Sequence, residues 1–450
     1  MGGYAYDSVI KYKISAKTMS PLHIGGHLGI GDEVLTDAVT GVPFIQASSL
    51  AGMFRGTSAI VFSKAETDEL FGPSKQNNGS DSSERGSRVR ITDGVIDPET
   101  VVMEIRPGVS VDRKTGTVNS RNGAGQKFDV TYVSSNAVFS FDVYLYINNE
   151  KRELKSRLES LFGMMNNGKA RLGAKKSGGA GKFEAVSIRR AEFDLQNDED
   201  RKKWILEDDG SIQYTDITKE CRMENTDIKY DITVEAKTEG PIQIKGVSMS
   251  EFGKDVPNSE NIKNGAGEFI IPGTSIKGAV RSQMEKIAAY QNKKSVINDT
   301  FGFIAEEHSD SKCGNITFND VVIGRREEND ANPLRNRIHI DKFTGGVMSP
   351  ALFKEKNAAG DLKIEIQIHN RSNPDATLGL LIIALRDLAV KSFNLGNGYA
   401  TGKGFLDVSA ITVKTSEDFA TIDCKNHCGE IQDEKGIIKN AMQALKEVQG

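Results

Sequence analysis

The chain has 450 residues and a formal net charge of −4, so it exceeds what one hydrophobic core usually supports, and nucleic-acid binding would require local basic patches. Its four cysteines are too few and too scattered to indicate a disulfide framework. The sequence contains no run of about 18 apolar residues, which a membrane-spanning helix would need. We therefore expect a cytoplasmic protein without membrane contact.

In chain order, strand and helix patterns alternate. The stretch YKISAKTMSPLHIG, from Tyr12, predicts a strand that leads into a glycine-bearing loop and then a capped helix. VFSFDVYLYI, from Val138, alternates as a half-buried strand, and KRELKSRLESLFGMM, from Lys151, predicts a helix that covers a sheet. The order of strand, helix, several strands, helix and strand predicts an α+β sandwich of ferredoxin or RRM type.

The same series of segments occurs twice. KTMSPLHIGG, from Lys17, matches KTEGPIQIKG, from Lys237, at five of ten positions. Three further pairs follow in the same order: GVPFIQASSLAGMFR with GEFIIPGTSIKGAVR, RPGVSVDRKTGTV with RNRIHIDKFTGGV, and LGAKKSGGAG with LGNGYATGKG. The interval between the paired segments rises slowly over the first three pairs, as expected for two copies that differ by short loop insertions.

The duplication divides the chain. We predict a first domain at 1–190, a linker or docking segment at 191–227, a second domain at 228–415 and a C-terminal helical tail at 416–450. The segment between the domains carries mixed charges and the only tryptophan, Trp204. In the tail, apolar residues recur at helical spacing, which predicts a helix that packs on a neighbouring surface.

The motifs in each copy resemble those of one family. The first copy has LHIGG at 22–26, an aspartate in the next loop, P-x-I-x-x-S-S-L-x-G at 43–52 and V-S-V-D-R-x-T-G at 109–116. This series resembles the RAMP superfamily and looks closest to the Cas-seven-type backbone subunits of type III CRISPR effectors. The resemblance implies two tandem RRM-like domains with thumb-type hairpins. It also implies three partners, namely CRISPR RNA, single-stranded target RNA and other type III effector subunits.

The resemblance also implies a catalytic residue, Asp32, for metal-dependent cleavage of the target RNA. Flexible glycines around it allow close approach to a ribose-phosphate chain, and its carboxylate can bind Mg²⁺ or another divalent cation such as Mn²⁺. The alternative is that Asp32 closes an Asx turn, and we interpret Asp37 as structural. In the second copy the loop is longer, and Asp255 is a candidate for catalysis and metal binding or a turn former.

Further candidates are predicted to contact RNA. Hydroxyl residues at the helix starts can cap the helices or bind phosphate, and basic residues follow them. The glycine-rich loops supply cations and, in the second copy, an aromatic ring for stacking, although such loops can also be solvated turns. The predicted set is His23, Gly25, Gly26, Ser48, Ser49, Arg55, Lys169, Arg171, Lys175, Lys176, Thr274, Ser275, Lys277, Arg281, Tyr399 and Lys403.

Several of these patterns leave alternatives open. His23 is either a general acid or base or a packed, hydrogen-bonded residue. The D-x-x-T-G motifs that begin at Asp112 and Asp341 predict polar turns, which by family position lead into the thumb hairpins. The residues that follow the second motif could wedge between bases or belong to the core, namely Val347, Met348, Leu352 and Phe353.

A zinc site is a weaker alternative. The segment Cys424-Lys-Asn-His427-Cys428 provides three zinc-binding side chains, whereas a structural site needs four. Only Cys313 or His308 could supply the fourth ligand. The sequence leaves this question open.

The leading functional hypothesis is a guide-dependent, metal-dependent endoribonuclease that acts on target RNA within a complex. One alternative is a scaffold that holds guide RNA without cutting. Another is a metal-independent enzyme that processes precursor guide RNA, which would need a His, Tyr or Lys group that the sequence does not identify.

Overall fold

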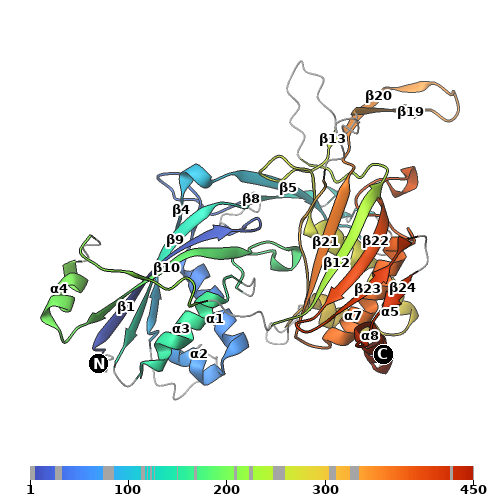
Figure 1. Cartoon of the computed structure of the whole chain (residues 1–450). Helices are drawn as coiled ribbons and strands as arrows, with labels where there is room; N and C mark the ends of the chain where they lie inside the picture. The colour runs from blue at the N-terminus through green and yellow to red at the C-terminus, as the bar shows by residue number, and fades with distance from the viewer. Residues whose placement is uncertain are drawn as a thin grey trace. The chain divides into compact units, whose positions relative to one another are not determined.

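A computed structural model describes residues 6–25, 33–73, 86–112, 117–118, 120–121, 124–125, 127–148, 151–166, 170–206, 210–221, 227–246, 259–303, 311–324, 334–425 and 429–448. The chain forms two compact units, drawn in Figure 1. Unit 1 comprises Met1–Met103, Thr131–Lys176 and Ala180–Asn225. Unit 2 comprises Glu104–Val130, Ser177–Gly179 and Thr226–Gly450.

Unit 1 is built on an antiparallel sheet that is covered by helices on one face (Figure 1). In spatial order its strands are β11 (Thr215–Asp216), β10 (Phe183–Asp194), β1 (Ser8–Thr18), β9 (Val138–Ile147), β4 (Gly94–Ile96) and β2 (Phe44–Ile45), with β3 (Val89–Ile91) also on β9. The helices on this face are α1 (Ala47–Val61), α2 (Lys64–Phe71) and α3 (Glu153–Gly163), whereas α4 (Asp198–Leu206) packs through Trp204 on the opposite face.

Alternation along β1 explains the two faces of this sheet. Ile10, Tyr12 and Ile14 are buried in the core with residues of α1 and α3, because every second side chain of a strand points to the same face. The residues between them point to the face that α1 and α3 leave free. A core on one side and a polar surface on the other is the pattern expected of a two-layer α+β domain.

Unit 2 repeats this plan. In spatial order its main sheet contains β17 (Ile316–Phe318), β21 (Asp361–His369), β12 (Ile228–Glu239), β22 (Phe405–Lys414), β23 (Phe419–Asp423) and β24 (Glu430–Gln432). Its helices are α5 (Gly273–Tyr290), α6 (Lys294–Phe301), α7 (Pro374–Ala389) and α8 (Ile437–Glu447). The predicted tail helix is α8, which buries Ile438, Ala441 and Leu445.

The strand order confirms the predicted fold class. In each unit the first long strand, β1 or β12, lies between the third and the fourth strand of a β-α-β-β-α-β series, as in ferredoxin-like domains. The register shifts between Ser15 and Ala16 in β1, and between Glu235 and Ala236 in β12. The interval between these two shifts equals the interval between the first pair of sequence motifs, so the duplication extends to the bulges.

Each copy also carries a hairpin outside the main sheet. In the first copy β5 (Met103–Val109) pairs with β8 (Lys127–Val133), and β6 (Ser120–Arg121) pairs with β7 (Ala124–Gly125). In the second copy β19 (Leu334–Ile340) pairs with β20 (Val347–Lys356), and β20 pairs with β13 (Ser259–Glu260). These are the predicted thumb-type hairpins.

Short two-residue strands complete the second unit. They form the pairs β14 (Ile270–Ile271) with β18 (Val321–Val322), and β15 (Gly302–Phe303) with β16 (Lys312–Cys313). The first pair holds the chain in position just before α5 begins at Gly273.

Candidate nucleic-acid interface

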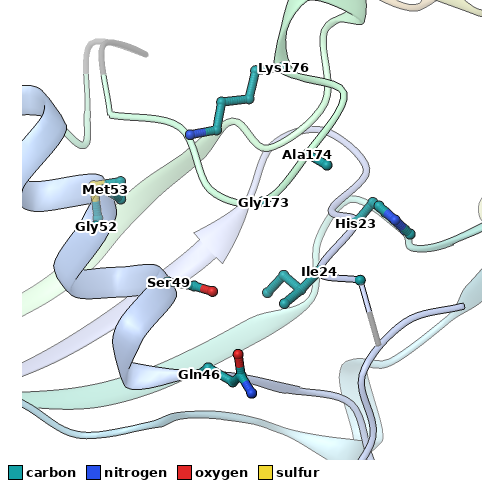
Figure 2. A pocket seen from close by; sticks show the side chains of 10 residues that line it. His23, Ile24, Gln46, Ser49, Gly52, Met53, Gly173, Ala174 and Lys176 are labelled. Atoms are coloured by element: carbon teal, nitrogen blue, oxygen red, sulfur yellow. The ribbon is translucent and has the colours of Figure 1, made fainter. Parts of the chain in front are cut away.

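A cavity of about 300 Å³ opens in unit 1 beyond the carboxyl end of β1. Three segments form its wall: the turn after β1, the first turns of α1 and the glycine-rich loop before β10. The lining residues are His23, Ile24, Gly25, Gln46, Ser49, Gly52, Met53, Gly173, Ala174 and Lys176. Figure 2 shows the Ser49 hydroxyl directed from α1 toward Ile24. Gly173 and Ala174 lie on the loop drawn above these two residues. Residues predicted from three separate motifs therefore meet here.

Backbone hydrogen bonds clamp the glycine-rich loop against the turn after β1. Gly181 N–H donates to the Pro21 carbonyl, and Leu172 N–H donates to the Gly181 carbonyl, both at 2.9 Å. A Cβ added to Gly181 would lie 1.9 Å from the Leu172 carbonyl oxygen, at a φ of +79°. Only glycine fits such a position, because other residues clash and are strained at this φ. We call this arrangement the glycine clamp of unit 1, residues 172–181.

Unit 2 contains the same clamp at residues 395–404. Gly404 N–H donates to the Pro241 carbonyl, and Leu395 N–H donates to the Gly404 carbonyl, again at 2.9 Å. A Cβ on Gly404 would lie 2.0 Å from the Leu395 carbonyl oxygen, at a φ of +78°. Asn397 N–H donates to the Gln243 carbonyl at 2.8 Å. The duplication therefore conserves the backbone geometry of the loop as well as its glycines.

The side chains on the clamp of unit 1 divide into two groups. Lys175 and Lys176 are exposed, as a phosphate-binding loop requires. Arg171 is buried, and its Nη1 donates to the Lys176 carbonyl at 3.0 Å, so it supports the loop from within. Lys169 lies outside the described residues.

The clamp of unit 2 carries different groups. Lys403 is buried, and its ammonium forms an ion pair with Glu355 and a 3.3 Å hydrogen bond to Gln243 Oε1. This position does not favour the predicted phosphate contact, because the ammonium already balances a buried carboxylate. Tyr399 is 59% exposed and packs at 5.6 Å against the ring of Phe405, so its ring is accessible for stacking.

Carboxylates from distant loops cap the two helices that follow the first strands. α1 begins at Ala47, whose N–H donates to Asp93 Oδ1 at 2.6 Å. α5 begins at Gly273, whose N–H donates to Asp320 Oδ1 at 2.8 Å. The predicted capping by Ser48 or Ser49, and by Thr274 or Ser275, is therefore wrong, since neither N-cap position has a side-chain cap and these residues lie inside the first turn.

The sequence contained a signal for these caps that motif matching missed. The interval from Asp93 to Asp320 falls between the intervals of the second and third motif pairs, so the two carboxylates occupy equivalent places in the duplication. They accept from helices 46 and 47 residues earlier in the chain, so no local capping pattern reveals them.

The basic residues after the helix starts are held by internal bonds. Arg55 Nη2 lies 2.7 Å from Asp68 Oδ1 and ties α1 to α2. Arg281 Nε donates to Glu285 at 2.8 Å, and Lys277 Nζ donates to Ser177 Oγ at 2.7 Å. Contact of these three side chains with RNA stays a prediction.

His23 is 3% exposed, and its Nδ1 lies 2.8 Å from the Thr131 carbonyl oxygen. Because a carbonyl oxygen only accepts, Nδ1 carries the proton in this bond. The ring also packs at 5.5 Å against Tyr132. These contacts agree with the interpretation of His23 as a packed, hydrogen-bonded residue.

The proposed catalytic residues, Asp32 and Asp255, and the glycine Gly26 lie outside the described residues. The ends of the two loops that contain them are described and are equivalent. Gly25 forms a bridge with Val34 in unit 1, and Lys245 forms a bridge with Asn261 in unit 2. Both loops therefore start two residues after a carbonyl group, that of His23 or Gln243, which accepts a hydrogen bond from a glycine clamp. The described part of the chain contains no group of three or more His, Cys, Asp or Glu side chains that could hold a metal ion.

The D-x-x-T-G turns form as predicted where they are described. Asp341 Oδ1 accepts from Phe343 N–H at 2.9 Å and from Thr344 N–H at 2.7 Å, and these hydrogen bonds lower the pKa of Asp341. Asp37 Oδ1 accepts from Thr40 N–H at 2.8 Å in the same way, which confirms that Asp37 is structural. In the first copy, residues 113–116 lie outside the described range.

Two other predictions are tested only in part. Val347 and Met348 are 58% and 46% exposed, so they do not belong to the core, whereas the side chains of Leu352 and Phe353 are not described.

Of the suggested zinc ligands, His308, His427 and Cys428 also lie outside the described residues. Cys424 is half-buried, and burial raises the pKa of its thiol. Zinc binding stays untested.

The fold and the site define a class: two tandem ferredoxin-like domains, each with a glycine clamp beside its first strand and an external hairpin. The chain belongs to the RAMP superfamily, whose family profile matches residues 15–184 and 235–407. A search of curated proteins found no match. Membership in this family indicates a CRISPR-associated, RNA-binding role. Within the described residues, no helix is long and apolar enough to cross a membrane.

Proposed function

We propose that this protein is the backbone subunit of a type III CRISPR effector, and that it binds CRISPR RNA and cleaves the paired target RNA. The observation that carries the proposal is the glycine clamp that recurs at 172–181 and 395–404. Loops without side chains at their closest positions let a ribose-phosphate backbone approach the protein backbone. Two clamps in one chain would supply two successive contacts along one guide.

The cleavage step is assigned to Asp32, with Asp255 as the second candidate. What supports it is the equivalent anchoring of their loops beside the clamps. A divalent cation, Mg²⁺ or Mn²⁺, would neutralise charge on the phosphate under attack or help to activate the ribose 2′-OH. Because one carboxylate supplies few ligands, the ion would take most of its ligands from RNA and water. The role of the protein is then to place one carboxylate and a rigid backbone beside the scissile phosphate.

A cleavage assay on the assembled complex tests this assignment. End-labelled target RNA is incubated with wild type, Asp32→Asn or Asp255→Asn, with Mg²⁺ and with a chelator. We expect each variant to lose its own set of cuts while target binding persists. Asp37→Asn is the matched control, because it keeps a turn-forming side chain in the same segment and should cut normally.

The outcomes separate the competing functions. If Asp32→Asn and Asp255→Asn both leave every cut intact, the site assignment is wrong. A complex that binds target and never cuts, in wild type as well, would support the scaffold alternative. Cleavage of precursor guide RNA that continues in chelator would support the metal-independent processing alternative.

RNA binding by the clamp is tested separately. The double variant Lys175→Ala/Lys176→Ala removes the two exposed cations and should reduce the slope of log affinity against log salt by about 1.4, since each phosphate contact on a single strand contributes about 0.7. Lys64→Ala/Lys439→Ala removes two exposed lysines from α2 and α8 and should leave binding unchanged. If the two double variants reduced the salt slope equally, a role of the clamp in RNA binding would be contradicted.

A further inference from the structure

The face of the unit 1 sheet opposite α1 and α3 is rich in cations. On β1, Lys11, Lys13 and Lys17 alternate with the buried core residues and therefore point to this face. The strand register places Arg189 of β10 opposite Lys13. It also places Arg90 of β3 opposite Tyr144 of β9. Arg90 and Arg189 are exposed, and Lys13 and Lys17 are half-buried.

Aromatic rings lie among these cations. The Arg90 guanidinium lies 5.1 Å from the centroid of the Tyr144 ring. Lys13 Nζ and the Arg189 guanidinium lie 5.4 Å and 5.8 Å from the centroid of Tyr214. The quadrupole of an aromatic ring attracts a cation over its face and helps to hold it in place.

The segment between the two repeats covers part of this face. Trp204 of α4 packs on Tyr144 at 5.7 Å and on Phe193 at 5.4 Å between ring centroids. Tyr214 precedes β11, which pairs with β10 at the edge of the sheet. The segment therefore supplies two aromatic rings at the border of the cationic surface.

Three carboxylates of the described strands lie on this face. Asp142 lies 3.6 Å from Lys11 Nζ, Asp216 is paired in register with Arg189, and Glu184 with Lys17. Across the described part of the face, five cations on β1, β3 and β10 meet these three carboxylates: Lys11, Lys13, Lys17, Arg90 and Arg189. On this face the described strands therefore carry more cations than carboxylates, although the whole chain has a net charge of −4.

The equivalent face of unit 2 keeps Lys237 in the place of Lys17 and lacks the other cations compared here. Asp231 and Thr233 of β12 stand where β1 has Lys11 and Lys13, at the same interval that separates the first pair of sequence motifs. The partner of Thr233 on β22 is Thr412, in the position of Arg189. The partner of Asp231 on β21 is Gln367, in the position of Tyr144. Because the same sheet folds with these residues, the fold itself does not require the cations and rings of unit 1.

We propose that the face of the unit 1 sheet opposite α1 and α3 binds single-stranded RNA. Its phosphates would contact Arg90, Lys13, Lys17 and Arg189, and its bases would lie beside Tyr214 and the Trp204 ring. Alternating cations and aromatic rings suit a polynucleotide, and lysines such as Lys13 and Lys17 are depleted from protein interfaces. This surface goes beyond the proposed function, which uses the glycine clamps and the loops that contain Asp32 and Asp255.

Trp204 is the only tryptophan of the chain, so its fluorescence reports on this face. We would titrate the full-length protein with oligouridine and follow Trp204 emission. Wild type should show saturable quenching. The double variant Lys13→Thr/Arg189→Thr installs the residues of unit 2, Thr233 and Thr412, and should bind roughly tenfold more weakly, with the salt slope reduced by about 1.4.

Matched variants make the result decisive. Lys237→Thr/Lys363→Thr removes two exposed lysines from the unit 2 sheet and should leave the quenching unchanged. The charge-preserving pair Lys13→Arg/Arg189→Lys should retain binding, which separates loss of charge from loss of folding. Lys175→Ala/Lys176→Ala should also retain the Trp204 response, so failure of the clamp and failure of this surface are distinguishable.

Three results would overturn the inference. The first is unchanged quenching in Lys13→Thr/Arg189→Thr. The second is loss of quenching in Lys175→Ala/Lys176→Ala, because the signal would then come from the clamp. The third is altered sedimentation of Lys13→Thr/Arg189→Thr with normal RNA affinity, which would identify the face as a protein interface.

Discussion

The two glycine clamps share a backbone and differ in the side chains that it carries. In unit 1 the loop presents Lys175 and Lys176 to solvent, whereas in unit 2 the loop presents Tyr399 and keeps Lys403 in a buried ion pair. The carbonyl groups of Pro21 and Pro241 accept equivalent hydrogen bonds from the two loops. Duplication has therefore conserved what the fold needs, the glycines, and has allowed the charged groups to diverge.

The largest effect is expected where the clamp admits no Cβ. Gly404→Ala would place a methyl group 2.0 Å from the Leu395 carbonyl oxygen, so backbone must move. We expect a loss of about 4 kcal/mol in the free energy of unfolding, measured by denaturant titration. Gly402→Ala, in the same loop at a φ of +72° with no atom within 4 Å, should cost only about 1 kcal/mol.

Gly181→Ala extends the test to unit 1, where the Cβ would lie 1.9 Å from the Leu172 carbonyl oxygen. The loss in the free energy of unfolding should equal that of Gly404→Ala. If Gly404→Ala lowers the free energy of unfolding no more than Gly402→Ala does, the close contact in the clamp does not explain why both copies have glycine there. If only one of Gly181→Ala and Gly404→Ala causes a large loss in the free energy of unfolding, the two clamps are not equivalent.

The next effect concerns the buried ion pair that distinguishes unit 2. Glu355→Gln leaves the Lys403 ammonium buried without its carboxylate partner and should cost about 3 kcal/mol, since removal of one partner exposes the full cost of burying the other charge. Lys403→Met should cost about 2 kcal/mol, because Arg337 still lies 3.0 Å from Glu355. If Lys403 instead served mainly to bind RNA, Lys403→Met would weaken RNA binding without loss of stability.

The same pair predicts a pH dependence with a defined sign. Burial opposes ionisation of Glu355, but hydrogen bonds from Lys403 and Arg337 outweigh it and lower its pKa from the ordinary 4.5. A lowered folded-state pKa means that the stabilisation is present above about pH 4.5 and is lost as the pH falls through the folded value. The stability difference between wild type and Glu355→Gln should therefore shrink in acid, and a difference that grows would contradict the assignment.

Residues that interact locally were predictable from the sequence, and those that meet across strands were not. The turns at Asp37 and Asp341 close within three residues, so local composition and spacing indicate them. The order of strand and helix patterns predicted the ferredoxin-like fold, and the duplication located its two copies. Lys403, by contrast, meets a carboxylate 48 residues earlier in the chain, and no sequence window contains both partners.

A smaller effect tests the two helix caps. Asp93→Ala should cost about 1 kcal/mol, the usual loss of an N-terminal cap on α1. Asp320→Ala should cost about 2 kcal/mol, because Asp320 also pairs with Arg106 at 2.7 Å, and the arginine is largely buried. Equal losses in the two variants would show that the pair with Arg106 adds nothing to the cap.

The smallest effect is expected for the hydroxyl residues that resemble caps in the sequence. Ser48 and Thr274 are exposed inside the first turns of α1 and α5, so Ser48→Ala and Thr274→Ala should each change the free energy of unfolding by less than about 0.5 kcal/mol. A loss in Ser48→Ala as large as in Asp93→Ala would restore the capping interpretation. Because the carboxylates already satisfy the first helical N–H groups, these hydroxyls remain available to a phosphate, and Ser48→Ala should affect RNA affinity more than stability.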